Sequence, residues 1–463
     1  MSSIKILEKD LTSSGGSLLD LDVVFVPGFV ALYPADTNYT PTKDTEDAWG
    51  KIEANVTRAD LTKDFPGAYV PTLCRTMAEF EAAFGKYPAK LTATAGKEGA
   101  ITIEDKSYIY AKNLLQLGLP VMYMAINELD ADDTTMVEGT MVTALTTMYT
   151  TNDNVNLEDR GEYSFKYLTS GGYPSFQVEI EAGTPKSNTI AANMGTLAST
   201  RGDCVALIDH PDNVDMTLSG DDSYFKLFQD AFKDDINAAY CAAFTPWINI
   251  NYTTYKYDGG KKTVTSNFTS MPPSFAYLSA LANSMKTNAS WLAVAGASRG
   301  QIPNLYSEKP LNINKILTNA VAENTYQQRN AVSINAITNI KPFGNRIWGN
   351  RTLKNNANEG NLTATSFLNI RNMISDVKKV VYSACKRYTF EQNNDVLWVN
   401  FKAAVEPTLN KMKTGAGLSG YKIIQGTTTE KAKLVATIKL YPLYAVEDFE
   451  ITVEMLDDEV KVS

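Results

Sequence analysis

Histidine and cysteine are scarce in this chain of 463 residues, which holds one histidine, His210, and four cysteines. The cysteines are Cys74, Cys204, Cys241 and Cys385. They form no CxxC motif and no close pair, so the sequence predicts neither a disulfide framework nor a zinc site. We interpret them as small buried hydrophobic residues.

Long apolar runs and an excess of positive charge are also lacking. No stretch approaches roughly 18 uncharged apolar residues, and the opening MSSIKILEKD carries charges, so we expect neither a membrane span nor a secretion signal. We therefore expect synthesis in a cytosol. The net charge of -9 argues against a nucleic-acid partner. An apolar share of 44% is typical of globular proteins, and the length suggests two to four domains.

The start of the chain has the pattern of an arm followed by an α/β core. Ile4 and Ile6 alternate with polar residues, and TSSGGS then indicates a flexible hinge, so we assign 1–24 to an N-terminal arm. Beyond it, VVFVPGFVALYP predicts a buried strand. Three later helix-to-strand alternations predict a parallel or mixed sheet. We assign 25–127 and 188–345 to this core domain.

Two further units differ from the core in pattern. Residues 128–187 are acidic and threonine-rich at first and then alternate around a Gly-Gly pair, which predicts an inserted β-rich domain. Later, two amphipathic helices precede the alternating KLVATIKLYPLYAVEDFEITVEM, which predicts two or three strands. We assign 346–445 to an α+β C-terminal domain and 446–463 to a C-terminal arm.

A search for a reaction centre finds no complete set of residues. His210 follows Asp209 at the end of a predicted strand, where ligand sites of α/β proteins gather. A serine hydrolase would also need a nucleophile in a strained turn and an oxyanion hole, and we assign neither. The acidic stretches DADD and SGDD lack the spacing of a calcium loop, and DGGKKT lacks the first glycine of a phosphate loop. We therefore predict no catalytic residue, no cofactor and no metal.

One long stretch, INAITNIKPFGNRIWGNRTL at 334–353, closely resembles the signature of contractile phage tail sheath proteins. The similarity continues through FLNIRNMISDVKKVVYSACKRYTFEQNNDVLW and GAGLSGYKII. Upstream, MAEFEAAFGK, ALIDHP and AAFTPWINI are similar to further segments of that family. The resemblance covers roughly 65–445 and is weakest in 128–187, where LTSGGYPSFQVEIE departs from the family's glycine-rich pattern.

The resemblance implies a non-enzymatic subunit that polymerises helically around an inner tail tube and contracts to drive the tube through the host envelope. It implies a core of subtilisin-like topology without protease function, an outward-facing inserted domain and a C-terminal domain that faces the tube. The implied partners are further copies of the chain in stacked six-fold rings, the tube protein, and baseplate and terminator proteins, with no nucleic acid and no membrane. The implied location is the tail of a virion, assembled in the host cytoplasm.

The signature stretch is interpreted as a structural joint between two domains. Gly344 and Gly349 permit a tight backbone path, Trp348 is expected to bury a large ring, and Arg351 to make a bidentate contact. On this interpretation, Trp348→Ala costs about 3 to 5 kcal/mol and abolishes assembly.

The resemblance also implies that neighbouring subunits exchange terminal strands, and the chain has suitable segments. Ile4 and Ile6 alternate near its beginning, and Phe449, Ile451 and Val453 alternate near its end.

A basic helix face is the last candidate contact surface. The predicted helix over 366–388 carries five basic residues against Asp376, so it is interpreted either as a solvated face or as a contact with the tube or with a neighbour's acidic tail. The basic residues are Arg371, Lys378, Lys379, Lys386 and Arg387.

Three alternatives remain open at this point. The same machine could be the sheath of a tailocin or of an extracellular contractile injection system. A type VI secretion sheath is disfavoured, because those sheaths are usually split over two chains. A subtilisin-type hydrolase would require turnover that disappears in His210→Ala.

Overall fold

The computed structural model describes most of the chain between residues 22 and 447, and every structural statement below concerns the described residues. They are 22–29, 71–84, 90–92, 102–104, 106–126, 156–176, 189–212, 224–258, 261–303, 312–313, 332–354 and 362–447.

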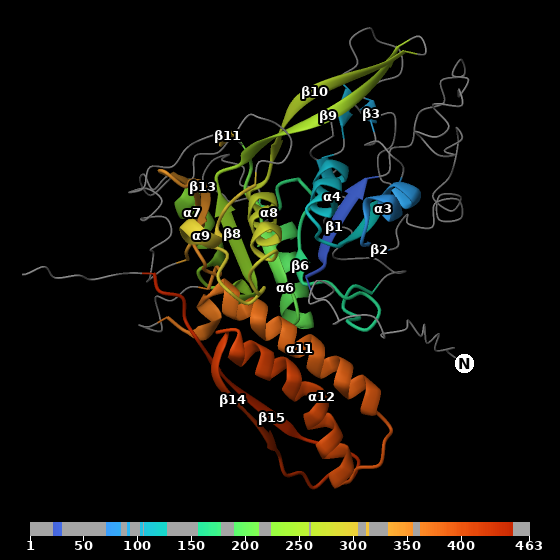
Figure 1. Cartoon of the computed structure of the whole chain (residues 1–463), viewed down its shortest axis with the longest axis vertical. Helices are drawn as coiled ribbons and strands as arrows, with labels where there is room; N and C mark the ends of the chain where they lie inside the picture. The colour runs from blue at the N-terminus through green and yellow to red at the C-terminus, as the bar shows by residue number, and fades with distance from the viewer. Residues whose placement is uncertain are drawn as a thin grey trace, which may run out of the picture.

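An eight-stranded mixed sheet forms the centre of the core domain (Figure 1). Its strands are β1 (Val24–Phe29), β2 (Thr72–Cys74), β5 (Val121–Ile126), β6 (Tyr167–Leu168), β7 (Val205–Ile208), β8 (Cys241–Thr245), β12 (Asn335–Ile340) and β13 (Gly344–Trp348). The order across the sheet is β13, β12, β8, β7, β6, β1, β5, β2. Strands β12 to β5 in this order run parallel, whereas β13 and β2 lie antiparallel to their neighbours. The mixed sheet expected from the sequence is therefore present.

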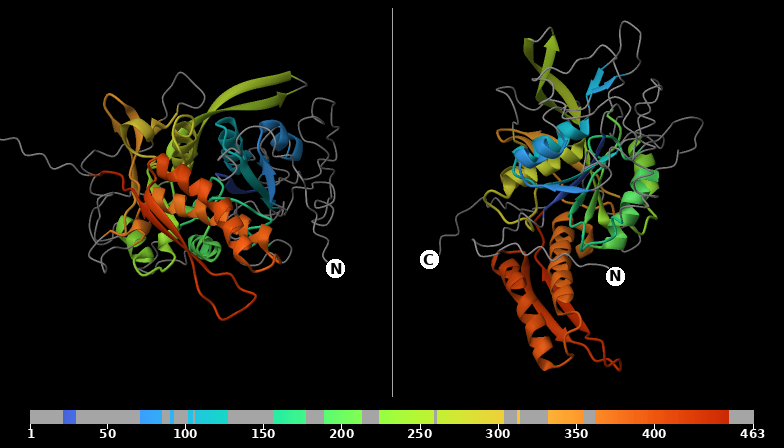
Figure 2. Two further views of the ribbon diagram at one scale, coloured as in Figure 1. Left: turned by 60° about the horizontal axis from the view of Figure 1, so that its bottom comes forward. Right: turned by 90° about the vertical axis from the view of Figure 1, so that its right-hand side faces the viewer.

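Helices cover both faces of this sheet, as the second view in Figure 2 shows. On one face lie α4 (Lys106–Gln116) and α8 (Pro273–Ser284), and on the other α6 (Thr189–Arg201) and α7 (Tyr224–Phe232). The sequence of β1 is an unbroken apolar run because both faces of this strand are buried. Val24 and Val26 belong to the core on one face of the sheet and Phe25 to the core on the other. A shorter helix, α3 (Met77–Phe84), buries Phe80 beside α4.

Strand β6 corrects the predicted boundary of the inserted domain. Residues 156–176, assigned to that domain from the sequence, belong to the core domain, where Leu157 packs into the hydrophobic core and Tyr167 pairs with Val24 of β1 and Val205 of β7. Local alternation does not distinguish a short parallel strand from one arm of a hairpin, because both have a period of two. The other parts of the predicted inserted domain, 128–155 and 177–187, lie outside the described residues.

The Gly-Gly pair after β6 does not form the expected hairpin turn. A Cβ at Gly171 would lie 1.9 Å from the carbonyl oxygen of Pro27, and the φ angle of Gly171 is +66°. Glycine is required here because the backbone passes directly against β1 in a left-handed conformation.

A long antiparallel hairpin that is not predicted from the sequence follows β8. Strands β9 (Ile248–Asp258) and β10 (Lys261–Met271) extend away from the sheet (Figure 1). Pro246 separates β8 from β9, since proline has no N–H to donate to a strand pair. The DGGKKT motif contributes its first residue, Asp258, to the end of β9 and its last three residues to the start of β10. Strand β11 (Asn312–Ile313) pairs with β9, and β3 (Lys90–Thr92) with β4 (Thr102–Glu104).

The C-terminal domain is a helical pair covering a two-stranded sheet, at one end of the core domain (Figure 2). It contains η3 (Ala364–Ser366), α11 (Leu368–Tyr388), α12 (Asp395–Thr414), β14 (Leu418–Gln425) and β15 (Ala436–Pro442). Both predicted helices are present. The predicted domain boundary at 346 is wrong, because Gly344–Trp348 is an edge strand of the core sheet.

Candidate interdomain joint

Helix α11 connects the two domains through its first three turns. Its amphipathic sequence buries Ile370, Met373 and Val377 in the core of the C-terminal domain. In the same turns Arg371, Asp376 and Lys379 are also buried, on the side that faces the core domain. Polar groups buried on both sides of a joint must be paired, because an unpaired buried charge is strongly destabilising.

The first pair of contacts centres on Lys166. Its ammonium lies 2.7 Å from Asp22 Oδ1 and 2.8 Å from Asp376 Oδ1, and all three side chains are fully buried. Asp22 and Lys166 lie just before β1 and β6, at the amino ends of two adjacent parallel strands. Burial opposes the charge of Lys166, but the two carboxylates outweigh it and raise the pKa of Lys166. The cation therefore stays charged and connects the sheet to α11.

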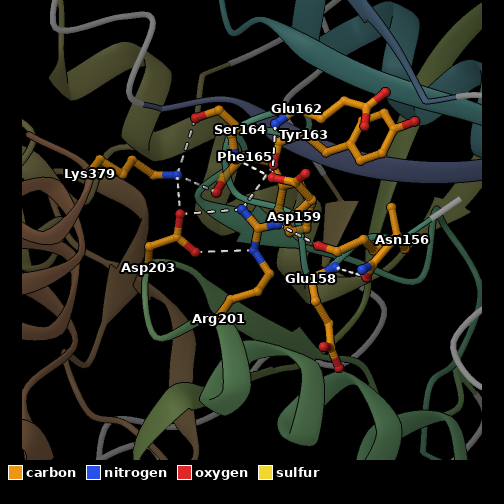
Figure 3. A network of polar contacts seen from close by, with 12 residues as sticks. Asn156, Glu158, Asp159, Glu162, Tyr163, Ser164, Phe165, Arg201, Asp203 and Lys379 are labelled. Carbon is orange, nitrogen blue, oxygen red and sulfur yellow. Dashed lines mark hydrogen bonds and ion pairs between the residues drawn. The ribbon is translucent and has the colours of Figure 1, made fainter. Parts of the chain in front are cut away.

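The second set of contacts centres on Asp203, just before β7 (Figure 3). Arg201 holds this carboxylate with two bonds, Nε to Oδ1 at 3.1 Å and Nη2 to Oδ2 at 3.2 Å. Lys379 of α11 donates to the same Oδ2 at 3.0 Å and to the carbonyl oxygen of Phe165 at 2.7 Å. Burial lowers the pKa of Lys379, and Asp203 opposes this effect.

Arg201 also binds the backbone of the segment that precedes β6. Its guanidinium donates to the carbonyl oxygens of Leu157 and Tyr163, the latter at 2.9 Å, and lies 4.0 Å from the ring centroid of Phe165. Together with the Lys166 cluster, three cations and three carboxylates meet at the amino ends of β1, β6 and β7. Asp376 and Lys379, three residues apart on one helix face, supply the contribution of α11.

Trp291, in the segment that follows α8, packs against the C-terminal domain at Gly415 and Gly417. Its ring is 2% exposed and its indole N–H donates to the carbonyl oxygen of Gly415 at 3.0 Å. A Cβ at Gly415 or Gly417 would lie 2.7 or 2.6 Å from this ring, so the loop GAGLSG is glycine-rich because Trp291 occupies the space. Trp291 is not among the residues predicted for the joint from the sequence, and Gly415 and Gly417 are the sequence signal that could have indicated a large neighbour.

Arg351 and Gly349, both proposed as joint residues, lie at this boundary. A Cβ at Gly349 would be 2.6 Å from Asn335 Oδ1, and Asn335 also binds both the N–H and the carbonyl oxygen of Arg351. The guanidinium of Arg351 pairs with Glu447 and lies 4.6 Å from the ring centroid of Phe367.

Gly344 and Trp348 do not lie as expected. Gly344 has φ of +80° and is the first residue of β13, directly after the turn from β12. Trp348 is only half-buried, on the edge strand β13, and the large ring that fills the joint belongs to Trp291. The sequence around Trp348 does not show whether other parts of the fold will bury its ring.

No protein-family model matches the chain. Among curated proteins it is similar to the tail sheath protein of Vibrio phage KVP40, at 20% identity over 266 residues. This match covers 54% of the chain and spans 36% of the length of that relative.

Two cryo-EM structures match nearly the whole chain. A chain of the anti-feeding prophage (AFP) baseplate in contracted state aligns with a TM-score of 0.56 and 16% identity, covering 98% of both chains. A chain of the PVC sheath complex of an extracellular contractile injection system, also contracted, aligns with a TM-score of 0.53 and 14% identity, covering 99% of this chain and 98% of that one. The chain has the fold of a contractile sheath subunit. The resemblance inferred from residues 334–353 is thereby confirmed.

Within this sheath fold, two of the five basic residues predicted on the face of α11 turn inward. Arg371 donates to the carbonyl oxygen of Ala239 at 2.9 Å and stacks 4.1 Å from the Tyr240 ring, and Lys379 binds Asp203. The prediction that these two residues face a tube or a neighbour is therefore wrong, because both side chains are buried against groups of the core domain. Lys378 is half-buried near Tyr240, and Lys386 and Arg387 are exposed.

The residues predicted for strand exchange all lie outside the described residues: Ile4, Ile6, Phe449, Ile451 and Val453.

The Asp209–His210 pair at the end of β7 is part of the packed interior. Asp209 accepts bonds from Ser274 N at 2.9 Å and Ser274 Oγ at 2.6 Å. His210 Nε2 lies 3.1 Å from Thr245 Oγ1, and its Nδ1 lies 2.8 Å from the carbonyl oxygen of Pro211. Burial raises the pKa of Asp209 to about 7 and lowers that of His210 to about 4. This geometry gives His210 no serine to activate.

The stretch GASRG at 296–300 has GxSxG spacing, which is typical of a serine nucleophile. In the structure it forms the four-residue helix α9 (Gly296–Arg299), which packs beside β13. Neither nitrogen of the His210 ring is hydrogen-bonded to its serine, Ser298. Over the part of the chain that the structure describes, no helix is long and apolar enough to cross a membrane, and no group of His, Cys, Asp and Glu could hold a metal ion.

Proposed function

We propose that the chain is the structural subunit of a contractile tail sheath. Copies polymerise helically around an inner tube, in stacked six-fold rings, and contract to drive the tube through the envelope of a host cell. The observation that carries this proposal is the sheath fold over 98% of the chain, together with the sequence match to a phage tail sheath protein.

The proposal extends to the parts of the subunit and to its partners. The core has subtilisin-like topology without protease activity, the inserted segment faces outward, and the C-terminal domain faces the tube. Partners are further copies, the tube protein, and baseplate and terminator proteins. The subunit resides in the virion tail and assembles in the host cytoplasm. The named contexts of the matched structures, a baseplate and a sheath complex, support the self-assembly and baseplate parts of this proposal.

The rigid joint supports a mechanism in which subunits rearrange as whole bodies. Six buried charges and Trp291 fix α11 to the core domain, so bending between the two domains would break several buried ion pairs at once. Motion is then expected in the terminal arms, which join one subunit to the next by exchanged strands. Each added strand brings backbone hydrogen bonds worth about 0.5 to 1.5 kcal/mol apiece.

Negative-stain microscopy of the purified full chain tests the proposal. We expect hollow tubes with a helical surface, and we expect a variant lacking both 1–21 and 448–463 to stay folded without forming them. A wild-type chain that stays monomeric at high concentration would overturn the proposal, and ordered tubes from the doubly truncated variant would overturn the strand-exchange part of it.

A second candidate is the sheath of an extracellular contractile injection system or tailocin, because the matched structures include AFP and PVC assemblies. The two candidates differ in neighbouring genes, since a phage sheath is encoded beside capsid genes. A hydrolase is tested separately, by turnover of peptide or ester substrates that disappears in His210→Ala.

A further inference from the structure

Two lysines face each other on the outer side of the C-terminal sheet. In the antiparallel register of β14 and β15, Lys422 pairs directly with Lys439, and both side chains are exposed. Within the described part of the chain, neither lysine makes a hydrogen bond or a salt bridge. Like charges in directly opposite positions destabilise a strand pair. The hairpin therefore carries a repulsive pair that a bound carboxylate would relieve.

The opposite face of the same hairpin is occupied. Tyr421, Ile423, Ile438 and Leu440 pack into the core of the C-terminal domain. In the described residues β14 and β15 pair only with each other, so both outer edges of this sheet have unpaired backbone groups. An added strand would fit if it carried apolar residues toward the helices and acidic residues toward the lysines.

The end of the chain has this pattern. Residues 362–447 carry 12 basic and 6 acidic side chains, a net charge of +6, whereas 448–463 carry 1 basic and 6 acidic side chains, a net charge of -5. In DFEITVE, the acidic residues Asp448, Glu450 and Glu454 share one parity, and Phe449, Ile451 and Val453 share the other. In an extended strand, residues of one parity lie on one face.

We propose that Lys422 and Lys439 form a recognition site for the acidic face of residues 448–454 from a second copy of the chain. The proposal rests on the proposed polymer and adds the residues that select the incoming strand and set its register. A register shifted by one residue would place Phe449 and Ile451 against the lysines and the carboxylates against the apolar core. The lysine pair thus favours one register over its neighbours.

The C-terminal segment of a second copy is a better candidate for the Lys422–Lys439 site than the C-terminal segment of the same chain. After β15 ends at Pro442, Leu443 N donates to the carbonyl oxygen of Gly417 at 3.0 Å, and Tyr444 packs 5.2 Å from Phe367. Glu447 then pairs with Arg351 beside the core domain. These contacts hold the last described residues beside Gly417, Phe367 and Arg351, so the segment that follows starts next to the core domain.

Charge reversal in the full chain tests the site. We expect Lys422→Glu/Lys439→Glu to raise the critical concentration for polymerisation about tenfold, since attraction becomes repulsion at two exposed pairs. The matched control is Lys431→Glu/Lys433→Glu, the same charge change in the loop between β14 and β15, which we expect to polymerise like wild type. Adding Glu450→Lys/Glu454→Lys to the first variant should restore polymerisation. Circular dichroism on the unpolymerised variants checks that each is folded.

Zero-length carbodiimide cross-linking of mixed light and isotope-labelled wild-type chains identifies the occupant. We expect cross-links from Lys422 or Lys439 to Glu450 or Glu454 between light and labelled chains, and cross-links confined to single chains would overturn the proposal in favour of the chain's own tail. Wild-type polymers together with an unaffected Lys422→Glu/Lys439→Glu variant would overturn this proposal alone. Absence of any wild-type polymer would overturn both this proposal and the proposed function.

Discussion

Lys166 and Asp376, separated by 210 positions in sequence, form a fully buried ion pair with Nζ 2.8 Å from Oδ1. The pair joins strand β6 of the core domain to helix α11 of the C-terminal domain. Removing Asp376 leaves Lys166 buried with Asp22 as its remaining carboxylate partner, and the loss of a buried hydrogen bond to a charged group typically costs about 1.5 to 3 kcal/mol. We expect Asp376→Ala to lower the free energy of unfolding by this amount in urea denaturation of the unpolymerised chain.

The exposed pair Lys226–Asp230 on α7 is the matched control. Its atoms are 3.0 Å apart, but both side chains are more than 40% exposed. Solvent screens such a pair, so Asp230→Ala should cost about 1 kcal/mol or less. Equal losses in Asp376→Ala and Asp230→Ala would contradict the structural importance of the buried pair.

Two tryptophans give opposite predictions, which revises what the sequence suggested. Trp291 is 2% exposed and its ring packs against two glycines, so Trp291→Ala should cost about 3 to 5 kcal/mol. Trp348 is half-buried at the sheet edge, and its replacement by alanine should cost less than about 2 kcal/mol. Thermal unfolding of both variants measures the difference. A larger loss in Trp348→Ala than in Trp291→Ala would show that Trp348 holds the joint after all.

Much of the fold follows from local patterns, because amphipathic helices and buried strands have strong periodicity. Helices α11 and α12 were predicted from apolar residues spaced three and four apart, and both are present. Strand β6 was misassigned because it is two residues long and pairs with strands far away in sequence. Local alternation carries no information about such partners.

The site was less predictable than the fold, since a charge count does not reveal where a side chain points. Arg371 and Lys379 belong to the same basic helix as Lys386 and Arg387, yet the first two are buried against the core domain and the last two are exposed. The decisive partners, Asp22, Lys166 and Asp203, each precede a strand, and only the sheet order brings them together.

Gly349 and Gly344 require glycine for different reasons. At Gly349 there is no space for a side chain, whereas at Gly344 the backbone has a positive φ angle. An alanine Cβ there would lie 2.6 to 2.9 Å from the side chain and backbone of Asn335, so Gly349→Ala must displace Asn335 and its bonds to Arg351. We expect a loss of about 2 kcal/mol or more in urea denaturation. Gly344→Ala, the control, meets no close contact but adopts φ of +80°, and should cost about 1 kcal/mol. A smaller loss at Gly349 than at Gly344 would contradict the packing argument.

Asp209 and His210 are neighbours whose protonation has opposite effects on stability. The pKa of buried His210 falls from 6.5 to about 4, so the unfolded chain binds the proton more readily and stability rises with pH between these values. The pKa of buried Asp209 rises from 3.8 to about 7, so the folded chain holds its proton more readily and stability falls as pH rises over this range. The two slopes largely cancel between pH 4 and pH 6.5 in the wild-type chain.

Replacing either residue should expose the slope of the other. Relative to wild type, Asp209→Asn should gain about 4 kcal/mol of unfolding free energy as pH rises from 4 to 7, because the opposing slope from a pKa shift of about 3 units at Asp209 is removed and the slope of His210 remains. His210→Gln should show the reverse trend. Urea denaturation midpoints of the three chains at half-unit pH intervals measure both differences, and other ionisable groups cancel in the subtraction. Parallel pH profiles for all three chains would mean that neither group changes its protonation equilibrium on folding, and the buried pair would then be irrelevant to acid stability.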